Sequence, residues 1–270
     1  MNLLKYIILG IIQGITEPLP ISSSGHIFII KNIFNTNIFN DLNFEIFVNF
    51  ASFIAILIIF WKDIIKIVKG FFIYIFDKDD RNKNYNDFKY ALMIIIGSIP
   101  VGILGVLFKD SIENTLTRTW VVGIAFILTA IFLLLVRNIN GKKGDFDITY
   151  KDAIIIGLFQ AIALFPGLSR SGMVLVGCLL CKLNRESSLK YTFMLYFPVS
   201  MATFMLGVKD IIEVGISTYL LFYYLIGMIF AFILTFITYR ILSECIKNGK
   251  LWKFSIYLIL LGLFVLIYFL

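Results

Sequence analysis

Six runs of this sequence contain no charged residue and are each about long enough, as a helix, to cross the ~30 Å hydrocarbon core of a bilayer. The runs are residues 46–61, 91–108, 119–136, 191–208, 217–239 and 254–270. Of the 270 residues, 60% are hydrophobic and only 15% are charged, whereas soluble domains average about 45–50% and about 25%. This balance excludes a soluble enzyme and a nucleic-acid-binding domain. We therefore predict an all-α polytopic membrane protein with no nucleic-acid partner.

Two further apolar stretches, residues 6–31 and 153–182, carry polar residues, prolines and glycines at their centres. Proline and glycine end a helix, and a serine that follows can cap the next one. Each stretch therefore predicts two half-helices that are too short to span the membrane. We expect both to be re-entrant hairpins, which a membrane tolerates only where the backbone is buried in protein or lines a cavity.

Most of the 24 lysines and arginines lie between the predicted spans, in residues 62–89, 137–151, 182–190 and 240–253. Loops on the cytoplasmic side of a membrane are enriched in these residues. Six spans, with two hairpins that return to their own side, place all four segments on one face. The sequence therefore predicts that these segments are cytoplasmic and that both termini lie outside.

The two hairpin sequences match each other at one constant offset, which aligns residues 10–25 with residues 157–172. The identical pairs are Gly10 and Gly157, Gln13 and Gln160, Ile15 and Ile162, Ser22 and Ser169, Ser24 and Ser171, and Gly25 and Gly172. The same offset aligns Lys-Asp-Ile-Ile at 62–65 with Lys-Asp-Ile-Ile at 209–212. Chance explains two matches at one offset poorly, so we predict an internal duplication.

The duplication divides a single membrane domain, residues 1–270, into repeat 1 at about 1–136 and repeat 2 at about 148–270. Each repeat consists of one re-entrant hairpin and three transmembrane helices. Because three is odd, the second repeat is inverted relative to the first, and the hairpin tips should meet near the middle of the membrane. Broken helices at the interface of inverted repeats commonly form a binding site.

Three ionisable residues, Glu17, His26 and Arg170, lie in or beside the predicted tips. A charge near the bilayer centre costs about 2.5–3.5 kcal/mol or more, so such residues are functional candidates. The donor fork of Arg170 fits phosphate oxygens, and the N–H groups at the start of a half-helix also bind anions. The alternative is that Arg170 pairs with Glu17 only to join the two halves.

Serines surround these charges at both tips, namely Ser22, Ser23, Ser24, Ser169 and Ser171. Their hydroxyls are candidates for binding an anionic substrate, and Ser23 is a candidate nucleophile if a base lies beside it. The alternative is that they only cap the half-helices. His26, at the start of the second half-helix, suits a general base or a nucleophile, with a structural histidine as the alternative.

Gln13 and Glu17 are four residues apart and share a helix face. With phosphate oxygens, they could hold a divalent cation such as Mg²⁺, which prefers one or two carboxylates plus phosphates and water. The alternative is a hydrogen bond between the two side chains that supports the turn. Together the tips predict phosphate chemistry inside a membrane, and the residues alone do not separate hydrolysis from transport.

At these positions the sequence resembles the bacterial undecaprenyl-diphosphate phosphatase family of the bacitracin-resistance type. The matching motifs are Gln13-Gly-Ile-Thr-Glu17, Pro20-Ile-Ser-Ser-Ser-Gly-His26 and Pro166-Gly-Leu-Ser-Arg-Ser171. The resemblance covers nearly the whole chain and implies an enzyme of the bacterial inner (plasma) membrane. It implies hydrolysis of undecaprenyl diphosphate to the monophosphate lipid carrier of cell-wall synthesis, and tolerance of bacitracin.

The resemblance also implies a divalent cation, Mg²⁺ or Ca²⁺, with Glu17 and Gln13 serving the metal or proton transfer. It implies Ser23 or His26 as nucleophile, Arg170 as phosphate clamp, and further hydrogen bonds from Ser169 and Ser171. One position departs from the family pattern, because Val174 stands where the family has threonine. We expect a hydroxyl to be missing from the site there.

A transporter or flippase of a polyprenyl phosphate is the alternative function, since inverted repeats with a mid-membrane site are common in transporters. The partners expected in either case are a polyprenyl diphosphate lipid and the bilayer, and a homodimer is left open.

Overall fold

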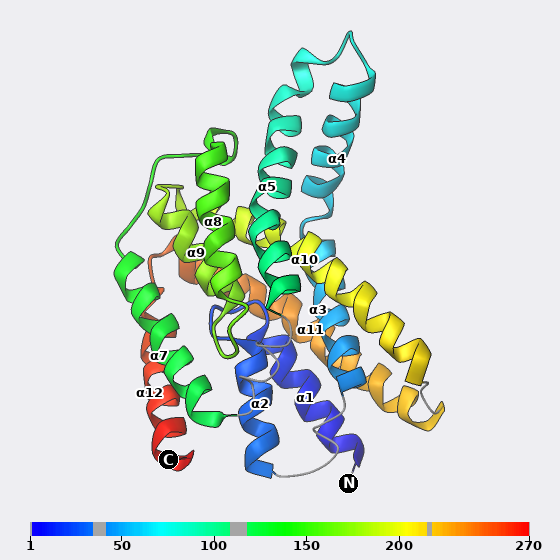
Figure 1. Ribbon diagram of the computed structural model, residues 1–270, viewed down its shortest axis with the longest axis vertical. Coiled ribbons are helices and arrows are strands. Elements are labelled where there is room, and N and C mark those ends of the chain that lie inside the picture. Colours follow the sequence, from blue (N-terminus) through cyan, green and yellow to red (C-terminus); the bar gives the residue numbers. More distant parts are fainter. Residues whose placement is uncertain (1, 35–41, 109–117, 215–217, 270) are drawn as a thin grey trace.

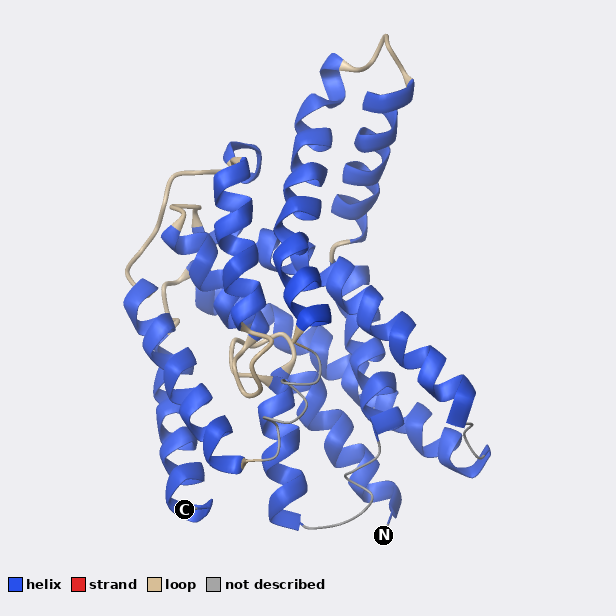
Figure 2. Ribbon diagram, viewed as in Figure 1, coloured by secondary structure: helices blue, strands red, loops and turns tan. Residues whose placement is uncertain are grey.

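The protein is described here by a computed structural model that covers residues 2–34, 42–108, 118–214 and 218–269. These residues form helices joined by loops, with one isolated β-bridge between Lys143 and Leu183 (Figures 1 and 2). The α-helices are α1 (Asn2–Thr16), α2 (Ser23–Phe34), α3 (Leu42–Ile59), α4 (Trp61–Phe76), α5 (Tyr85–Leu107), α7 (Thr119–Val136), α8 (Tyr150–Ile162), α9 (Arg170–Leu180), α10 (Arg185–Val214), α11 (Thr218–Lys247) and α12 (Trp252–Phe269).

Five of these helices, α5, α7, α10, α11 and α12, are long and apolar enough to cross a membrane. Helices α3 and α4 together meet the same requirement but are bent by 75° at the residue between them. Each of the six predicted runs overlaps one of these elements over most of its described residues, and the expected all-helical, multi-pass membrane protein is confirmed.

Helix α4 differs from the expectation, because the sequence placed residues 62–89 in a loop. Its lysines at 62, 66 and 69 are exposed on one side of the helix, while Ile67 and Gly70 are buried. Gly70 lies so close to α5 that a Cβ atom there would be 2.5 Å from the Asp87 Cβ. Charged residues spaced by three and four positions thus leave one apolar face free, and this face packs as a helix against α5.

Two helix–turn–helix hairpins, α1–α2 and α8–α9, occur where the sequence predicts them. The first begins and ends at the end of the molecule that carries both termini, and the second at the opposite end (Figure 1). Their turns meet in the interior, where the Ser171 hydroxyl donates to the Leu19 carbonyl oxygen at 3.0 Å. Gly167 in the second turn has a φ of +87°, and a Cβ atom there would be 2.9 Å from the Ala125 Cβ, so both conformation and space favour glycine.

The hairpins dock on helices from the other half of the chain through close glycine contacts. A Cβ atom on Gly10 of α1 would lie 2.3 Å from the Gly227 carbonyl oxygen of α11. A Cβ atom on Gly157 of α8 would lie at the same distance, 2.3 Å, from the Gly97 carbonyl oxygen of α5. Gly10 and Gly157 are matching positions of the sequence repeat, so both hairpins dock through the same repeat position. The inverted-repeat relation of the halves stays a prediction.

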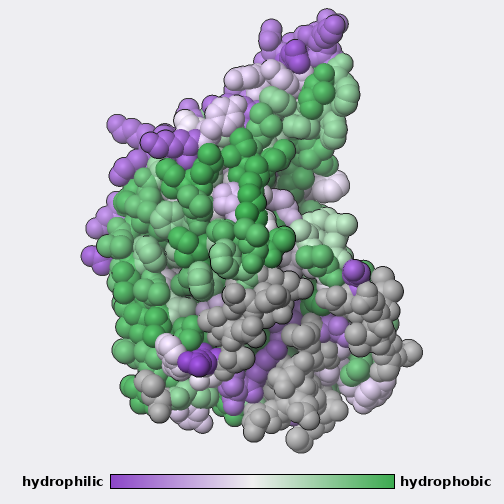
Figure 3. Space-filling view, viewed as in Figure 1, coloured by the Kyte–Doolittle hydropathy of each residue, from purple (hydrophilic) through white to green (hydrophobic). Residues whose placement is uncertain are grey.

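Hydrophilic side chains gather at the end of the molecule that carries the 77–84 loop, beyond a broad apolar surface (Figure 3). Ion pairs join the elements of this end: Lys143 pairs with Asp152 at 2.8 Å, and Lys190 with Asp63 at 2.6 Å and Asp145 at 3.0 Å. The lysine- and arginine-rich segments therefore lie together, opposite the termini. Which of the two membrane faces this end adjoins stays a prediction.

Candidate active site

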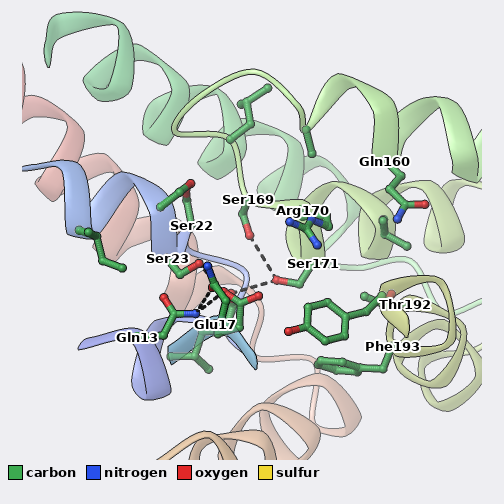
Figure 4. Close-up of a pocket in the computed structure, with 18 of the residues that line it drawn as sticks. Gln13, Glu17, Ser22, Ser23, Gln160, Ser169, Arg170, Ser171, Thr192 and Phe193 are labelled. Atoms are coloured by element: carbon green, nitrogen blue, oxygen red, sulfur yellow. Dashed lines mark hydrogen bonds between the residues drawn. The ribbon is translucent and has the colours of Figure 1, made fainter. Parts of the chain in front are cut away.

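A cavity of about 130 Å³ lies where the two hairpin turns meet. Helices α1, α2, α3, α8, α9 and α10 contribute side chains to its wall (Figure 4). Every predicted site residue except His26 lines it: Gln13, Glu17, Ser22, Ser23, Ser24, Ser169, Arg170 and Ser171. Residues more than 140 positions apart in the sequence are thus brought to one polar chamber inside an apolar protein.

The α1 side of the cavity holds the pair Gln13 and Glu17. The Gln13 amide Nε2 donates to Glu17 Oε2 at 3.0 Å and to Asn49 Oδ1 on α3 at 2.6 Å. The hydrogen bond that the sequence offered as an alternative to metal binding is therefore formed. Gln13 Oε1 is buried and has no hydrogen-bond partner among the described residues. Because an unpaired buried acceptor is costly, this atom marks a place for an added donor or cation.

Ser23 is the first residue of α2 and faces the same carboxylate. Its Oγ donates a hydrogen bond to Glu17 Oε2. Glu17 lies just after the C-terminal end of α1, and Ser23 lies at the N-terminal end of α2, where the helix dipole favours negative charge on oxygen. A hydroxyl next to a carboxylate base has the arrangement of an activated nucleophile.

The neighbouring serines are mainly helix caps. The Ser22 hydroxyl accepts from the Gly25 N–H at 3.3 Å, and the Ser169 hydroxyl accepts from the Gly172 N–H at 3.1 Å. Capping, the alternative that the sequence left open, thus applies to Ser22 and Ser169. Ser171 lies 3.3 Å from Ser169, Oγ to Oγ, and its hydroxyl joins the two turns. These serines fix the turns that carry Ser23 and Arg170.

Arg170 begins α9 and extends from the opposite turn into the cavity (Figure 4). Its Nη1 donates to Ser200 Oγ of α10 at 3.3 Å, and the guanidinium carbon lies 5.8 Å from the centroid of the Tyr196 ring. In the described part of the chain, none of the ion pairs includes Arg170. The expected alternative, a lock between Arg170 and Glu17, is not formed, and most guanidinium donors stay available to an anion.

His26 does not lie with the other candidates, contrary to the expectation that base, acid and clamp converge. Its ring is buried between α2, α7 and α12, with Phe126 at 5.3 Å and Tyr257 stacked at 5.7 Å, centroid to centroid. Nδ1 lies 2.7 Å from the Ser22 carbonyl oxygen, which can only accept, so Nδ1 carries the proton. Nε2 then accepts from the Tyr257 hydroxyl at 2.7 Å. Both ring nitrogens are used in holding the first turn of α2.

The cavity wall includes residues that the sequence reasoning missed, among them Asn49 on α3 and Tyr196 on α10. Asn49 had a signal, because it is an isolated amide in an apolar run, four residues after Glu45. Tyr196 had none, since one tyrosine in an aromatic-rich helix is unremarkable. Val174 lines the cavity, so this position adds an apolar side chain to the wall and no hydroxyl.

Comparison with known proteins agrees with this geometry. Residues 6–264 match the family described as "Bacitracin resistance protein BacA". The chain belongs to this family. It is 40% identical over 266 residues, 98% of this chain and 97% of the relative, to Undecaprenyl-diphosphatase 2 of Bacillus thuringiensis (strain Al Hakam). It is 39% identical over 269 residues, 99% of this chain and 97% of the relative, to the Undecaprenyl-diphosphatase of Oceanobacillus iheyensis. These matches confirm the family resemblance that the hairpin motifs indicated.

Proposed function

We propose that this BacA-family chain hydrolyses undecaprenyl diphosphate to undecaprenyl phosphate and inorganic phosphate in the bacterial plasma membrane. The observation that carries the proposal is the Ser23 hydroxyl bonded to the Glu17 carboxylate, in the cavity that Arg170 enters from the opposite turn. Hydrolysis recycles the lipid carrier and explains bacitracin tolerance. The nearly full-length similarity to undecaprenyl-diphosphatases supports this function over lipid transport.

The diphosphate is held from the second hairpin. Arg170 provides paired N–H donors, which bind phosphate oxygens in a bidentate manner. The start of α9 adds free backbone N–H groups and the positive end of the helix dipole. The Ser171 hydroxyl lies next to them. This arrangement orients the terminal phosphorus toward Ser23 and stabilises the charge that develops in the transition state.

The chemistry then proceeds in two displacements. Ser23 Oγ attacks the terminal phosphorus while its proton passes to Glu17, and the bond from that phosphorus to the bridging oxygen breaks. Undecaprenyl phosphate leaves with the bridging oxygen and takes up the proton. Water next attacks the phosphoserine, Glu17 accepts a proton from that water, and Ser23 recovers its proton as inorganic phosphate departs.

The oxygen donors on the α1 side fit a divalent cation, Mg²⁺ or Ca²⁺, only in part. Glu17 and the unpaired Gln13 Oε1 are suitable ligands, but no group of three or more His, Cys, Asp or Glu side chains that could hold a metal occurs within the described ranges. Phosphate oxygens and water would have to complete the coordination. When bound, the cation would neutralise phosphate charge. We therefore expect cation binding to be weak without substrate.

The orientation of the protein in the membrane is part of the same proposal. Clustering of the lysine- and arginine-rich segments at one end supports a cytoplasmic location of that end, with both termini outside. A homodimer and the lack of a nucleic-acid partner remain predictions from the sequence.

The test is phosphate release from undecaprenyl diphosphate in detergent, with and without EDTA. Ser23→Ala removes the nucleophile, so we expect a loss of at least about 10³-fold in kcat. Arg170→Ala removes charge-assisted hydrogen bonds worth about 1.5–3 kcal/mol each, so we expect a loss of about 10²-fold or more in kcat/KM. Ser98→Ala is the matched control, because its hydroxyl bonds only within α5, to Ile94 at 2.8 Å. Release that survives in Ser23→Ala would remove this serine from the mechanism.

A second arm separates Ser23 from His26. Tyr257→Phe removes the donor to His26 Nε2 and should lower stability by about 1 kcal/mol, while phosphate release changes less than tenfold. Tyr268→Phe, exposed on the same helix, is the control. A collapse of release in a folded Tyr257→Phe protein would instead place the imidazole in the chemistry.

A further inference from the structure

A wholly apolar groove of about 430 Å³ lies between α3, α4, α5 and α10. Its wall includes Phe53 and Leu57 of α3, Ile67 of α4, Ile94 of α5, and Phe197 and Met201 of α10, and every other side chain that lines it is also apolar. We refer to it as the α3–α4 groove. Its size is within the range of about 300–1,000 Å³ that is typical of small-molecule sites.

The groove is a consequence of the bend between α3 and α4. The two helices meet at 75°, so α4 leans toward α5 and leaves the angle beside α10 unfilled. Phe60 holds the bend from the inside, with its ring 5.7 Å from Phe193 and 5.5 Å from Tyr239, centroid to centroid. Lys190 holds it at the first turn of α4 through its ion pair with Asp63 at 2.6 Å.

The groove adjoins the candidate active site at Phe53. This ring lines the groove and also a cavity of about 60 Å³ that reaches Glu17 and Arg170. At the far end, Phe72 of α4 and Ile95 of α5 are about half exposed on the apolar outer surface. A path from the phosphate-binding turn to the lipid-facing side of the protein thus consists of these two spaces, with the buried Phe53 ring as the wall between them.

We propose that the α3–α4 groove binds the head-proximal isoprene units of the substrate's polyprenyl chain while Arg170 holds the diphosphate. This inference rests on the proposed function. An amphiphile with a charged head and an apolar chain matches the order of side chains along the path, polar at Glu17 and Arg170 and apolar from Phe53 outward. Because the chain leaves one apolar medium for another, the groove contributes orientation rather than hydrophobic driving force.

The first experiment fills the groove and compares two chain lengths. Ile94→Trp places an indole in the groove, and Ile99→Trp, on the lipid-facing side of the same helix, is the matched control. For undecaprenyl diphosphate we expect kcat/KM to fall at least about tenfold in Ile94→Trp, the size of a typical overpacking penalty. For isopentenyl diphosphate, whose chain ends near Phe53, we expect no difference between Ile94→Trp and wild type. Equal effects of both variants on both substrates would overturn the groove assignment.

The second experiment uses the wild-type chain and so does not depend on how a variant folds. A polyprenyl diphosphate with a diazirine on its second isoprene unit is photolysed in proteoliposomes, and adducts are located by mass spectrometry. We expect adducts on groove residues such as Phe53, Ile94 and Met201, which excess phosphatidylglycerol does not suppress. Adducts confined to outer residues such as Ile99, or suppression by phosphatidylglycerol, would show a site for ordinary lipid and overturn the proposal. Wild type that releases no phosphate would instead contradict the proposed function.

Discussion

In the proposed mechanism, a proton passes between two helix ends, from Ser23 to Glu17. Glu17 follows the last residue of α1 and Ser23 is the first residue of α2, so the dipole ends oppose each other across a single hydrogen bond. Neither residue needs a histidine for this, which explains why the only histidine of the chain, His26, can serve the packing of α2 against α12.

A substitution at Val174 provides a gain-of-function test. Its side chain lines the cavity one turn after Ser171, where the family pattern has threonine. Val174→Thr keeps the shape and adds a donor toward the phosphate. We expect kcat/KM for phosphate release to rise about tenfold, since a hydrogen bond to a charged group is worth about 1.5–3 kcal/mol.

The control for this substitution is Val176→Thr on the same helix. Val176 is fully buried in the core and does not line the cavity, so its hydroxyl should lower stability and leave the rate per folded molecule unchanged. An unchanged rate in Val174→Thr would mean that the position does not face the transferred phosphate.

At the scale of elements, the second hairpin is fixed by the start of α8. Thr149 caps the helix, and Asp152 accepts from the Thr149 N–H at 2.9 Å and pairs with Lys143 at 2.8 Å. Burial by itself raises the pKa of Asp152, but the hydrogen bonds from Lys143 and Thr149 outweigh it, so the pKa lies below the ordinary 3.8. The charged carboxylate therefore stabilises the folded state.

The lowered pKa of Asp152 determines how its contribution to stability changes with pH. Because the folded pKa is the lower one, the stabilisation is complete above the ordinary pKa and is lost as the pH falls through the folded value. We expect Asp152→Asn to lower the Tm by a constant amount above about pH 5 and by less as the pH falls below 4. Asp79→Asn, exposed in the 77–84 loop, should show no such difference. A Tm difference for Asp152→Asn that grows toward low pH would contradict the assignment.

The elements that the sequence predicts correctly are those where the membrane imposes a large penalty. Uncharged runs had to be spans, and runs interrupted by Pro, Gly and Ser had to turn back. Helix α4 was not predicted, because a lysine-rich segment is typical of a loop unless the spacing of its lysines is considered. The direction in which the His26 side chain points could not be predicted either, because its ring is held by Tyr257, which lies 231 positions away in the sequence. The cavity residues were found mainly because polar residues are rare in this chain.

At the scale of the whole molecule, the hairpins hold the two halves together. Gly10→Ala would place a Cβ atom 2.3 Å from the Gly227 carbonyl oxygen and force α1 away from α11. We expect stability to fall by about 1–3 kcal/mol, measured as a lower Tm in detergent, together with reduced phosphate release because Gln13 and Glu17 move with α1.

Gly102→Ala on α5 is the matched control for this prediction. Apart from the adjacent residues and the nearby backbone of α5, no atom of the described residues lies within 4 Å of a Cβ atom built there, so the change should be neutral or slightly stabilising through helix propensity. A Gly10→Ala protein as stable and active as Gly102→Ala would show that the close approach of α1 and α11 is dispensable.

The first hairpin docks on a helix from the second half of the chain, and this limits the order in which the protein can fold during synthesis. α1 (Asn2–Thr16) leaves the ribosome first, yet the helix on which it docks, α11 (Thr218–Lys247), is among the last to be made. Until then α1 lacks the α11 surface on which it docks, and a re-entrant segment cannot rest in bare lipid. Nascent chains must therefore keep their first hairpin in the translocon or at the membrane surface until nearly all of the protein has been synthesised. We accordingly expect the candidate active site to close as one of the last steps of biogenesis.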